Sequence, residues 1–361
     1  MKTHIRRFKL SDTFIEQYKD REVPWGPLGY VTFKRTYARR LSEFDENATG
    51  TEEWFQTCRR VIEGMFEMQK QHVYRLGLEW NDQKAQRTAK NAYDRLFNLK
   101  WTPPGRGLWM MGTEFVNKRT AAGLFNCAFR STRELNTKGG YLFSWMMDAL
   151  MLGIGVGFDT LGAGTLEIQQ PEYTNEIYTV PDSREGWVES VQILLNGFFF
   201  GAKVPKIDYS AIRPYGALIK GFGGTSSGAD PLKELHDSLT ELYSGRAGQS
   251  ITSVDIVDTE NLIGRCVVAG NVRRSAALAL GNHEDFEYLQ MKNDSEKLAH
   301  HRWGSNNSFH AIVGQDYTWH AEQSQKNGEP GYIWLDNART RGRFADPPRD
   351  DDKNVMGFNP C

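Results

Sequence analysis

The sequence predicts an α/β protein in which a mainly helical region, residues 1–104, precedes a region of mixed helices and strands, residues 105–361. Two observations predict this class. Through the first hundred residues, apolar side chains recur every three or four positions, which is the period of a helix that packs on a core. After Pro104, short apolar runs alternate with helical stretches, which is typical of an α/β sheet or barrel.

Two helices are predicted in the first region, over residues 51–76 and 83–98. Glu52 and Glu53 lie in the first turn of the earlier helix, where negative charge suits the helix dipole. The prolines at 103 and 104 end the second helix, because proline interrupts a helix interior.

In the second region, the predicted strands are the apolar runs at residues 107–111, 124–129, 276–280 and 332–335. The predicted helices cover residues 185–200, 230–244, 253–265 and 284–299. Residues 165–180 lack a helical period and predict a β-hairpin beside the sheet.

Composition and charge exclude several classes of protein. With 39% hydrophobic and 25% charged residues, the chain is globular and neither disordered nor collagenous. The 44 basic residues nearly balance the 45 acidic ones, so the net charge gives no support to direct nucleic-acid binding or to an acidic membrane surface. No segment resembles a signal peptide or a membrane span, and we therefore expect a cytoplasmic protein.

The cysteines and histidines give no metal motif. Four cysteines are spread along the chain without a C-x-x-C pair, which argues against a zinc site and against a disulfide scaffold. Cys58 and Cys266 lie in apolar contexts and are predicted to be small buried side chains. His300 and His301 are adjacent, so they diverge, and we interpret them as surface or packing residues; composition leaves Cys127 and Cys361 undecided.

Glycine-rich segments occur at residues 153–158, 221–228 and 270–275. None has the complete dinucleotide-binding pattern or the Gly-Lys-Ser/Thr of a phosphate-binding loop. Their glycines, hydroxyls and arginines leave two readings open, namely contact with phosphate and simple tight turns.

Several short segments, in order along the chain, together resemble the class II, adenosylcobalamin-dependent ribonucleotide reductases, and in particular the monomeric ribonucleoside-triphosphate reductases. The segment at residues 24–39 reads PWGPLGYVTFKRTYAR, and the chain ends in Asn359-Pro360-Cys361. The others are residues 181–187, 212–217, 221–228, 267–281, 300–308 and 327–331.

The resemblance implies a ten-stranded α/β barrel, of which residues 105–361 form the first half, with a cysteine on a central finger loop. It implies that Cys361 becomes a thiyl radical and takes the 3′-hydrogen of the substrate ribose, while Asn359 hydrogen-bonds the sugar hydroxyls. Cys127 resembles the first of two redox cysteines, which reduce the 2′-position and end as a disulfide.

Further contacts follow from the same resemblance. Residues 221–228 resemble the glycine-rich turn of the family. The loop that links effector and substrate base corresponds to Gly270, Asn271, Val272, Arg273, Arg274 and Ser275, and substrate contacts are implied at Asn126, Ser305, Asn306 and Asn307.

The implied cofactor is adenosylcobalamin, whose cobalt–carbon bond supplies the radical, so no protein metal ligand is expected. The implied partners are a ribonucleoside-triphosphate substrate, a deoxynucleoside-triphosphate effector, a thioredoxin-like reductant and the C-terminal half of the reductase. Effector binding stays open, because residues 129–181 are shorter than in similar reductases.

The sequence also departs from the family pattern. The glutamate expected two residues after Cys361, the second redox cysteine and the C-terminal cysteine pair do not occur. A fragment, one chain of a split gene and a piece ending at an intein junction all fit this pattern. Two rival functions are a catalytically silent nucleotide-binding or assembly subunit and a class I reductase that uses a di-iron partner.

Overall fold

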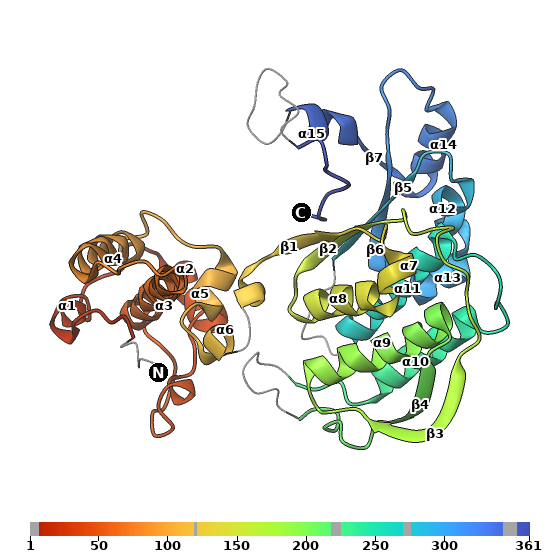
Figure 1. Cartoon of the computed structure of the whole chain (residues 1–361). Helices are drawn as coiled ribbons and strands as arrows, with labels where there is room; N and C mark the ends of the chain where they lie inside the picture. The colour runs from red at the N-terminus through yellow and green to blue at the C-terminus, as the bar shows by residue number, and fades with distance from the viewer. Residues whose placement is uncertain (1–6, 119–120, 218–224, 270–275, 342–351) are drawn as a thin grey trace. The chain divides into compact units, whose positions relative to one another are not determined.

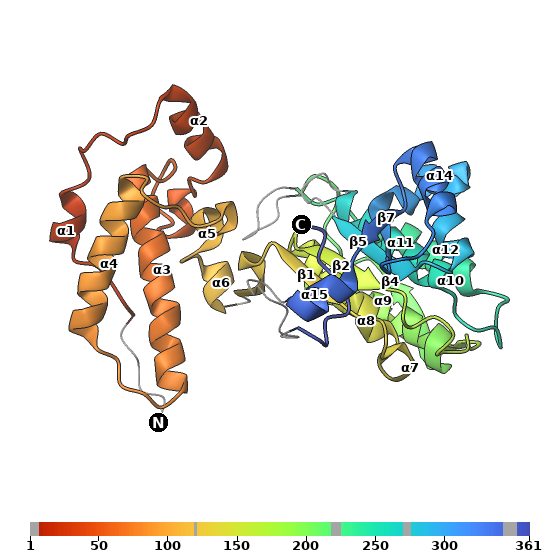
Figure 2. The same ribbon diagram turned by 90° about the horizontal axis from the view of Figure 1, so that it is seen from above.

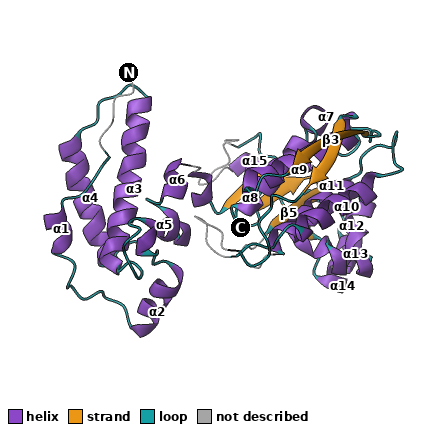
Figure 3. Ribbon diagram, turned by 90° about the horizontal axis from the view of Figure 1, so that it is seen from below, coloured by secondary structure: helices purple, strands orange, loops and turns teal. Residues whose placement is uncertain are grey.

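The structure is a computed structural model that describes residues 7–118, 121–217, 225–269, 276–341 and 352–361 (Figure 1). The chain forms two compact units, Met1–Phe125 and Asn126–Cys361. Figure 3 shows the strands gathered in the second unit. In the described part of the chain, no helix is both long and apolar enough to cross a membrane.

The first unit is helical. Its elements are α1 (Asp12–Glu16), α2 (Pro27–Thr36), η1 (Leu41–Glu43), α3 (Trp54–Arg75), α4 (Asp82–Phe97), α5 (Gly105–Met110), α6 (Glu114–Lys118) and η2 (Ala121–Leu124). Both helices predicted from periodicity are confirmed, as α3 and α4. Cys58 and Ile62 of α3 and Ala89 and Tyr93 of α4 are fully buried in one apolar core. The domain division predicted at residue 104 stays a prediction.

The prediction of a strand at residues 107–111 is wrong, because this run belongs to helix α5. A five-residue apolar run has no period that separates a strand from a short helix, and Pro104 directly before it favours a helix start. Arg60 of α3 donates hydrogen bonds to the carbonyl oxygens of Leu108 and Met111, at 2.9 and 2.6 Å. These bonds satisfy carbonyl groups near the end of α5 and fix it against α3.

The second unit contains the sheet strands. They are β1 (Cys127–Arg130), β2 (Gly155–Asp159), β3 (Glu172–Thr179), β4 (Lys203–Asp208), β5 (Ala277–Asn282), β6 (Ser305–His310) and β7 (Gly331–Ile333). Its helices are α7 (Leu135–Lys138), α8 (Gly140–Met151), α9 (Arg184–Phe200), α10 (Asp230–Tyr243), α11 (Ser253–Val268), α12 (Phe286–Gln290), η3 (Met291–Asn293), α13 (Ser295–His300), η4 (Arg302–Gly304), α14 (Thr318–Asn327) and α15 (Leu335–Arg341).

The main sheet is parallel, with strand order β1-β2-β5-β6-β7. Each new strand is added on the same side of the one before it. Because crossovers between neighbouring parallel strands are right-handed, this order puts the connecting helices on one face of the sheet. The other face is left for the C-terminal segment, which lies beside β1 and β2 (Figures 1 and 2).

Four helices form the covering layer. Helices α8 and α11 pack on β2 and β5, and α9 and α10 pack against α8 and α11. Val156 and Phe158 of β2 are fully buried beneath this layer. The predicted α/β class, with a helical region before it, is confirmed; the sheet of the described residues is open rather than closed into a barrel.

The hairpin predicted at residues 165–180 is wrong. Strand β3 lies in this segment, but it pairs in parallel with β4, and α9 is the crossover between them. The lack of a helical period correctly indicated a strand in this segment. The pairing differs from a hairpin because α9 follows β3, and a long connection of this kind joins parallel strands.

The single helix predicted at residues 284–299 is also wrong, since this stretch is divided into α12, η3 and α13. Asp285 accepts a hydrogen bond from the backbone N–H of Tyr288, and Asp294 accepts one from that of Lys297, at 3.1 and 3.0 Å. Each aspartate is an N-cap and starts a separate helix. The helices predicted at 185–200, 230–244 and 253–265 are confirmed as α9, α10 and α11.

Candidate functional site

The candidate site lies on the sheet face opposite the helices. Side chains alternate between the two faces of a strand, so alternate residues of neighbouring strands share a face. The register aligns Cys127 with Gly155, Phe129 with Gly157, and Leu278 with both Gly157 and Asn306. We call this surface the open face; it is defined by Cys127, Phe129, Gly155, Gly157, Leu278 and Asn306.

Residues 352–361, here named the C-terminal segment, run across the open face over β1 and β2. Arg339 of α15 donates a hydrogen bond to the carbonyl oxygen of Val355 at 3.0 Å, which fixes the start of the segment. Further along, Gly357 lies against the ring of Phe129, and the backbone of Phe358 lies directly over Gly157. The segment therefore reaches the strand ends where Cys127 is found.

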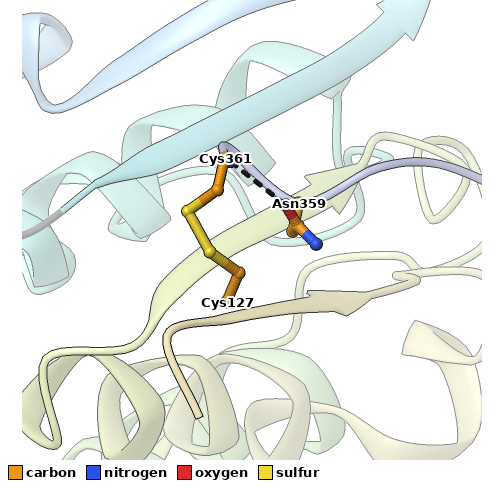
Figure 4. Close-up of a disulfide and its surroundings, with 3 residues drawn as sticks. All are labelled: Cys127, Asn359 and Cys361. Atoms are coloured by element: carbon orange, nitrogen blue, oxygen red, sulfur yellow. Dashed lines mark hydrogen bonds between the residues drawn. A yellow bond between two sulfur atoms is a disulfide. The ribbon is translucent and has the colours of Figure 1, made fainter. Parts of the chain in front are cut away.

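Cys127 and Cys361 are joined by a disulfide, with 6.5 Å between their Cα atoms (Figure 4). This Cα separation lies in the usual range for disulfides. The resemblance implies that the disulfide partner of Cys127 is a second redox cysteine outside this sequence, whereas the structure pairs Cys127 with Cys361. The side chain of Cys361 is exposed, so reductants can reach the bond from solvent.

Asn359 shapes the turn that presents Cys361. Its Oδ1 accepts the backbone N–H of Cys361 at 3.1 Å, an Asx turn that fixes the backbone two residues on (Figure 4). The side-chain amide nitrogen points away from this turn. Because that nitrogen carries two donor hydrogens, Asn359 can still bind an acceptor oxygen of another molecule.

The predicted contact residues of β6 are divided between the two faces. Asn306 is exposed on the open face. Ser305 and Asn307 point to the helix side and are buried, with the Ser305 hydroxyl donating to Asn307 Oδ1 at 2.9 Å. The structure thus brings only Asn306 of these three side chains to the face that carries Cys127 and Cys361, and their substrate contacts stay predictions.

Asn126 lies immediately before β1, where its side chain is exposed and its carbonyl oxygen accepts the N–H of Gly155 at 2.7 Å. This bond joins β1 and β2 next to Cys127. The predicted effector and substrate loop, residues 270–275, lies outside the described residues, as do residues 221–224 of the glycine-rich turn. The loop connects α11 to β5, whose Leu278 belongs to the open face.

An ion-pair network behind β6 explains the His300-His301-Arg302 motif. Arg302 donates two hydrogen bonds to the buried carboxylate of Asp258, both at 2.7 Å, and His301 Nε2 lies 2.9 Å from Asp258 Oδ1. Burial would raise the pKa of Asp258, but the bonds from Arg302 and His301 outweigh it and hold the pKa below its ordinary value. The interpretation of His301 as a packing residue is confirmed.

Two buried titratable groups were not found from the sequence. His236 of α10 lies 2.7 Å from the Tyr209 hydroxyl and 3.2 Å from the Ser190 hydroxyl, and burial lowers its pKa to about 4. Burial raises the pKa of Glu260 of α11 well above its ordinary value, and neither carboxyl oxygen has a partner among the described residues. Both are polar residues within apolar helix faces. From the sequence alone, such a residue cannot be distinguished from one at the exposed edge of the helix.

The two remaining cysteines are structural. Cys58 and Cys266 are free and buried, as predicted. Burial raises the pKa of the Cys58 thiol well above its ordinary value and that of Cys266 to about 12. Neither thiol therefore has the thiolate character that a reactive cysteine needs.

Comparison with protein families gives two matches. Residues 10–113 match the ribonucleotide reductase alpha domain, and residues 159–242 match the insertion domain of B12-dependent ribonucleotide reductases. The first match covers α1 to α5, and the second begins at the end of β2 and extends to α10.

Individual proteins are similar along the whole chain. A probable adenosylcobalamin-dependent ribonucleoside-triphosphate reductase of Dictyostelium discoideum is 43% identical, over 100% of this chain and 50% of that protein. The corresponding reductase of Euglena gracilis is 42% identical, over 98% of this chain and 49% of that protein. The reductase of Lactobacillus acidophilus is 37% identical, over 98% of this chain and 55% of that protein.

A crystal structure of a B12-dependent, class II ribonucleotide reductase has the same fold, with a TM-score of 0.81 at 33% identity. It matches 98% of this chain and 56% of that chain. The fold and the matched domains are those found in ribonucleotide reductases. The chain belongs to the B12-dependent, class II family, and it spans about half the length of the curated relatives it matches.

Proposed function

We propose that this chain supplies the radical cysteine and one reducing cysteine of an adenosylcobalamin-dependent ribonucleoside-triphosphate reductase, active when the remaining half of the reductase is present. The observation that supports this proposal most directly is the pairing of Cys361 with Cys127 on the open face, next to Asn359. The similarity of the chain to proteins named adenosylcobalamin-dependent ribonucleoside-triphosphate reductases supports the reaction and the triphosphate substrate.

The reaction needs Cys361 as a free thiol. The disulfide with Cys127 has no sulfur-bound hydrogen, so a dithiol must first donate two electrons and two protons to open it. This exchange converts the dithiol to a disulfide and leaves both cysteines as thiols. The exposure of Cys361 suits this exchange.

Cys361 then acts on the ribose as a sulfur radical. It takes the hydrogen atom from the 3′-carbon, which reforms the Cys361 thiol and leaves the unpaired electron on the sugar. The neighbouring 2′-carbon–oxygen bond becomes easier to break, and the 2′-hydroxyl leaves as water with a proton from Cys127. Cys127 and a second cysteine of the missing half supply two electrons to the 2′-position and end as a disulfide. The Cys361 thiol then returns a hydrogen atom to the 3′-carbon and is a sulfur radical again.

Asn359 orients the substrate. Its Oδ1 is held by the turn to Cys361, so its amide nitrogen is the group that donates to a ribose hydroxyl. Because donor and radical cysteine share one turn, a sugar held by Asn359 has its 3′-carbon near the sulfur.

Adenosylcobalamin, when bound, supplies a carbon-centred radical able to take hydrogen from a thiol. The Cys361 thiol fits this role, because it is exposed and lies on the open face, opposite the layer of α8 and α11. This chain would supply the hydrogen on Cys361 Sγ. It would not need to supply a metal ligand, because the corrin ring of the cofactor holds the cobalt.

Residues 270–275 are proposed to link an effector to the substrate base, and a thioredoxin-like protein is the proposed reductant in the cytoplasm. In chain order these residues join α11 to β5, whose Leu278 belongs to the open face, and this order supports the assignment. Contact of Asn126, Ser305, Asn306 and Asn307 with substrate is proposed on the resemblance to the family, and the exposure of Asn306 supports it best.

The test is turnover of a ribonucleoside triphosphate with adenosylcobalamin and a dithiol, with and without a complementing C-terminal half. We expect deoxynucleotide only when both halves are present. A folded, assembled complex that binds nucleotide without turnover would favour the silent assembly subunit. Deoxynucleotide made by this chain alone would contradict the need for a second half.

A further inference from the structure

Strand β2 carries glycine at two positions where it faces the C-terminal segment, Gly155 and Gly157. A Cβ atom on Gly157 would stand 1.8 Å from the carbonyl oxygen of Phe358 and 3.0 Å from the Cα of Asn359. These are backbone atoms, which cannot rotate away as a side chain can. The close approach of the segment therefore depends on the missing side chain.

Two neighbouring glycines also make close contacts, but with side-chain atoms, which can move more easily than backbone atoms. A Cβ on Gly155 would stand 2.9 Å from Cγ of Pro360, which is a side-chain ring. On the segment itself, a Cβ on Gly357 would stand 2.2 Å from the Phe129 ring. The segment and the strands thus interlock through glycines on both sides.

Backbone conformation does not explain these glycines. None of the three is among the glycines with positive φ, so any residue could adopt their backbone angles. Glycine inside a strand weakens it and often marks the close approach of another backbone. Space for the segment is the requirement that remains.

We infer that Gly157 and Gly155 are positioning residues, which seat the backbone of residues 358–360 on β2 and thereby bring the Cys361 sulfur to Cys127. The geometric part of this inference concerns the two sulfurs alone. Its meaning for catalysis rests on the proposed function, since the same seat then sets the radical sulfur relative to the substrate.

The experiment measures the Cys127–Cys361 disulfide in the full chain without cofactor or substrate. Parent and variants are equilibrated in glutathione buffers of increasing ratio, acid-quenched and alkylated, and the bonded fraction is mapped by mass spectrometry. Gly157→Ala should lower the equilibrium constant for this disulfide by about ten-fold or more, because overpacking against backbone displaces the segment. Gly26→Ala is the matched control, since a Cβ there meets nothing within 4 Å, and it should equal the parent.

Gly155 allows a rescue experiment that a general loss of stability cannot imitate. Gly155→Ala should weaken the disulfide less than Gly157→Ala, because the proline ring can shift. Adding Pro360→Ala removes the contacted Cγ and should restore the parent equilibrium. This pair also keeps the inference testable if Gly157→Ala does not fold.

Parent-like disulfide formation in folded Gly157→Ala would overturn the inference, as would a Gly155→Ala defect that Pro360→Ala does not relieve. The outcome is independent of the reductase assay. If disulfide formation in the glycine variants does not respond to these contacts as described above, the positioning role fails, whatever the turnover. If the disulfide responds as expected but the complemented enzyme makes no deoxynucleotide, the proposed function fails.

Discussion

Cys127 and Cys361, which are 234 positions apart in sequence, are bonded to each other where the first strand of the sheet meets the end of the C-terminal segment. A sulfur in a disulfide can neither give nor take a hydrogen atom. Reduction of this bond is consequently the first requirement of the chemistry proposed for Cys361, and the two cysteines should differ in what they do afterwards.

Replacing Cys127 should separate radical formation from product formation. In the complemented enzyme, Cys127→Ser keeps the Cys361 thiol but lacks one of the two reducing sulfurs. Loss of the 2′-hydroxyl as water leaves a ketone at the 3′-carbon of the sugar, and without the pair of reducing thiols this intermediate has no reductant and decomposes. We expect free base and tripolyphosphate in place of deoxynucleotide, measured together by chromatography.

Cys266→Ser is the matched control for this experiment, because Cys266 is free, buried and on helix α11, in the layer that covers the other face of the sheet. It should cost about 1 kcal/mol of stability through added polarity and leave the product unchanged. Near-normal deoxynucleotide from Cys127→Ser would refute its redox role.

The stability of the second unit should depend on His236 in acid. Its pKa is lowered from 6.5 to about 4 by burial, so the unfolded chain binds the extra proton between these values. The parent should lose about 2 to 3 kcal/mol from this group as pH falls from 7 to 4.5, whereas His236→Asn should lack this loss. Urea unfolding at both pH values measures it.

His72→Asn is the control for that series, since His72 is exposed on α3. A pH dependence of His236→Asn identical to that of the parent would show that His236 is not held neutral.

Glu260 should act in the opposite direction. Burial raises its pKa well above the ordinary value of 4.5, so above pH 4.5 the folded state keeps a proton that the unfolded state releases. The parent then loses stability as pH rises, by up to about 1.4 kcal/mol per pH unit. Gln at this position does not titrate. The free energy of unfolding in urea of Glu260→Gln, relative to that of the parent, should therefore increase between pH 5 and 7.

Exposed Glu322 on α14 provides the comparison for that series. Glu322→Gln should follow the parent at every pH. If Glu260→Gln does the same, Glu260 is ionised in the folded chain.

The sequence predicted elements whose pattern is local. Helices α3 and α4 have an apolar face at helical spacing, and β5 is an apolar run of alanine and leucine, so each could be recognised from its own residues. Strand β2 could not, because Gly155 and Gly157 give it the appearance of a loop. The cause of those glycines is the backbone of residues 358–360, about two hundred positions away.

The candidate site divides in the same way. The resemblance to the reductases singled out Cys127, Asn359 and Cys361 one at a time. Their arrangement depends on the parallel pairing of β1 with β2 and on the segment that crosses them, neither of which short-range patterns contain. Likewise, Ser305, Asn306 and Asn307 form one polar run, and only the strand register shows which side chain reaches the open face.

The most direct test of the account is tritium release from 3′-labelled ribonucleoside triphosphate by the reduced, complemented enzyme. An oxygen radical is far harder to generate than a sulfur radical, so Cys361→Ser should abolish release, while Cys127→Ser should retain it. Release from Cys361→Ser at the parent rate would contradict the assignment of the radical to Cys361.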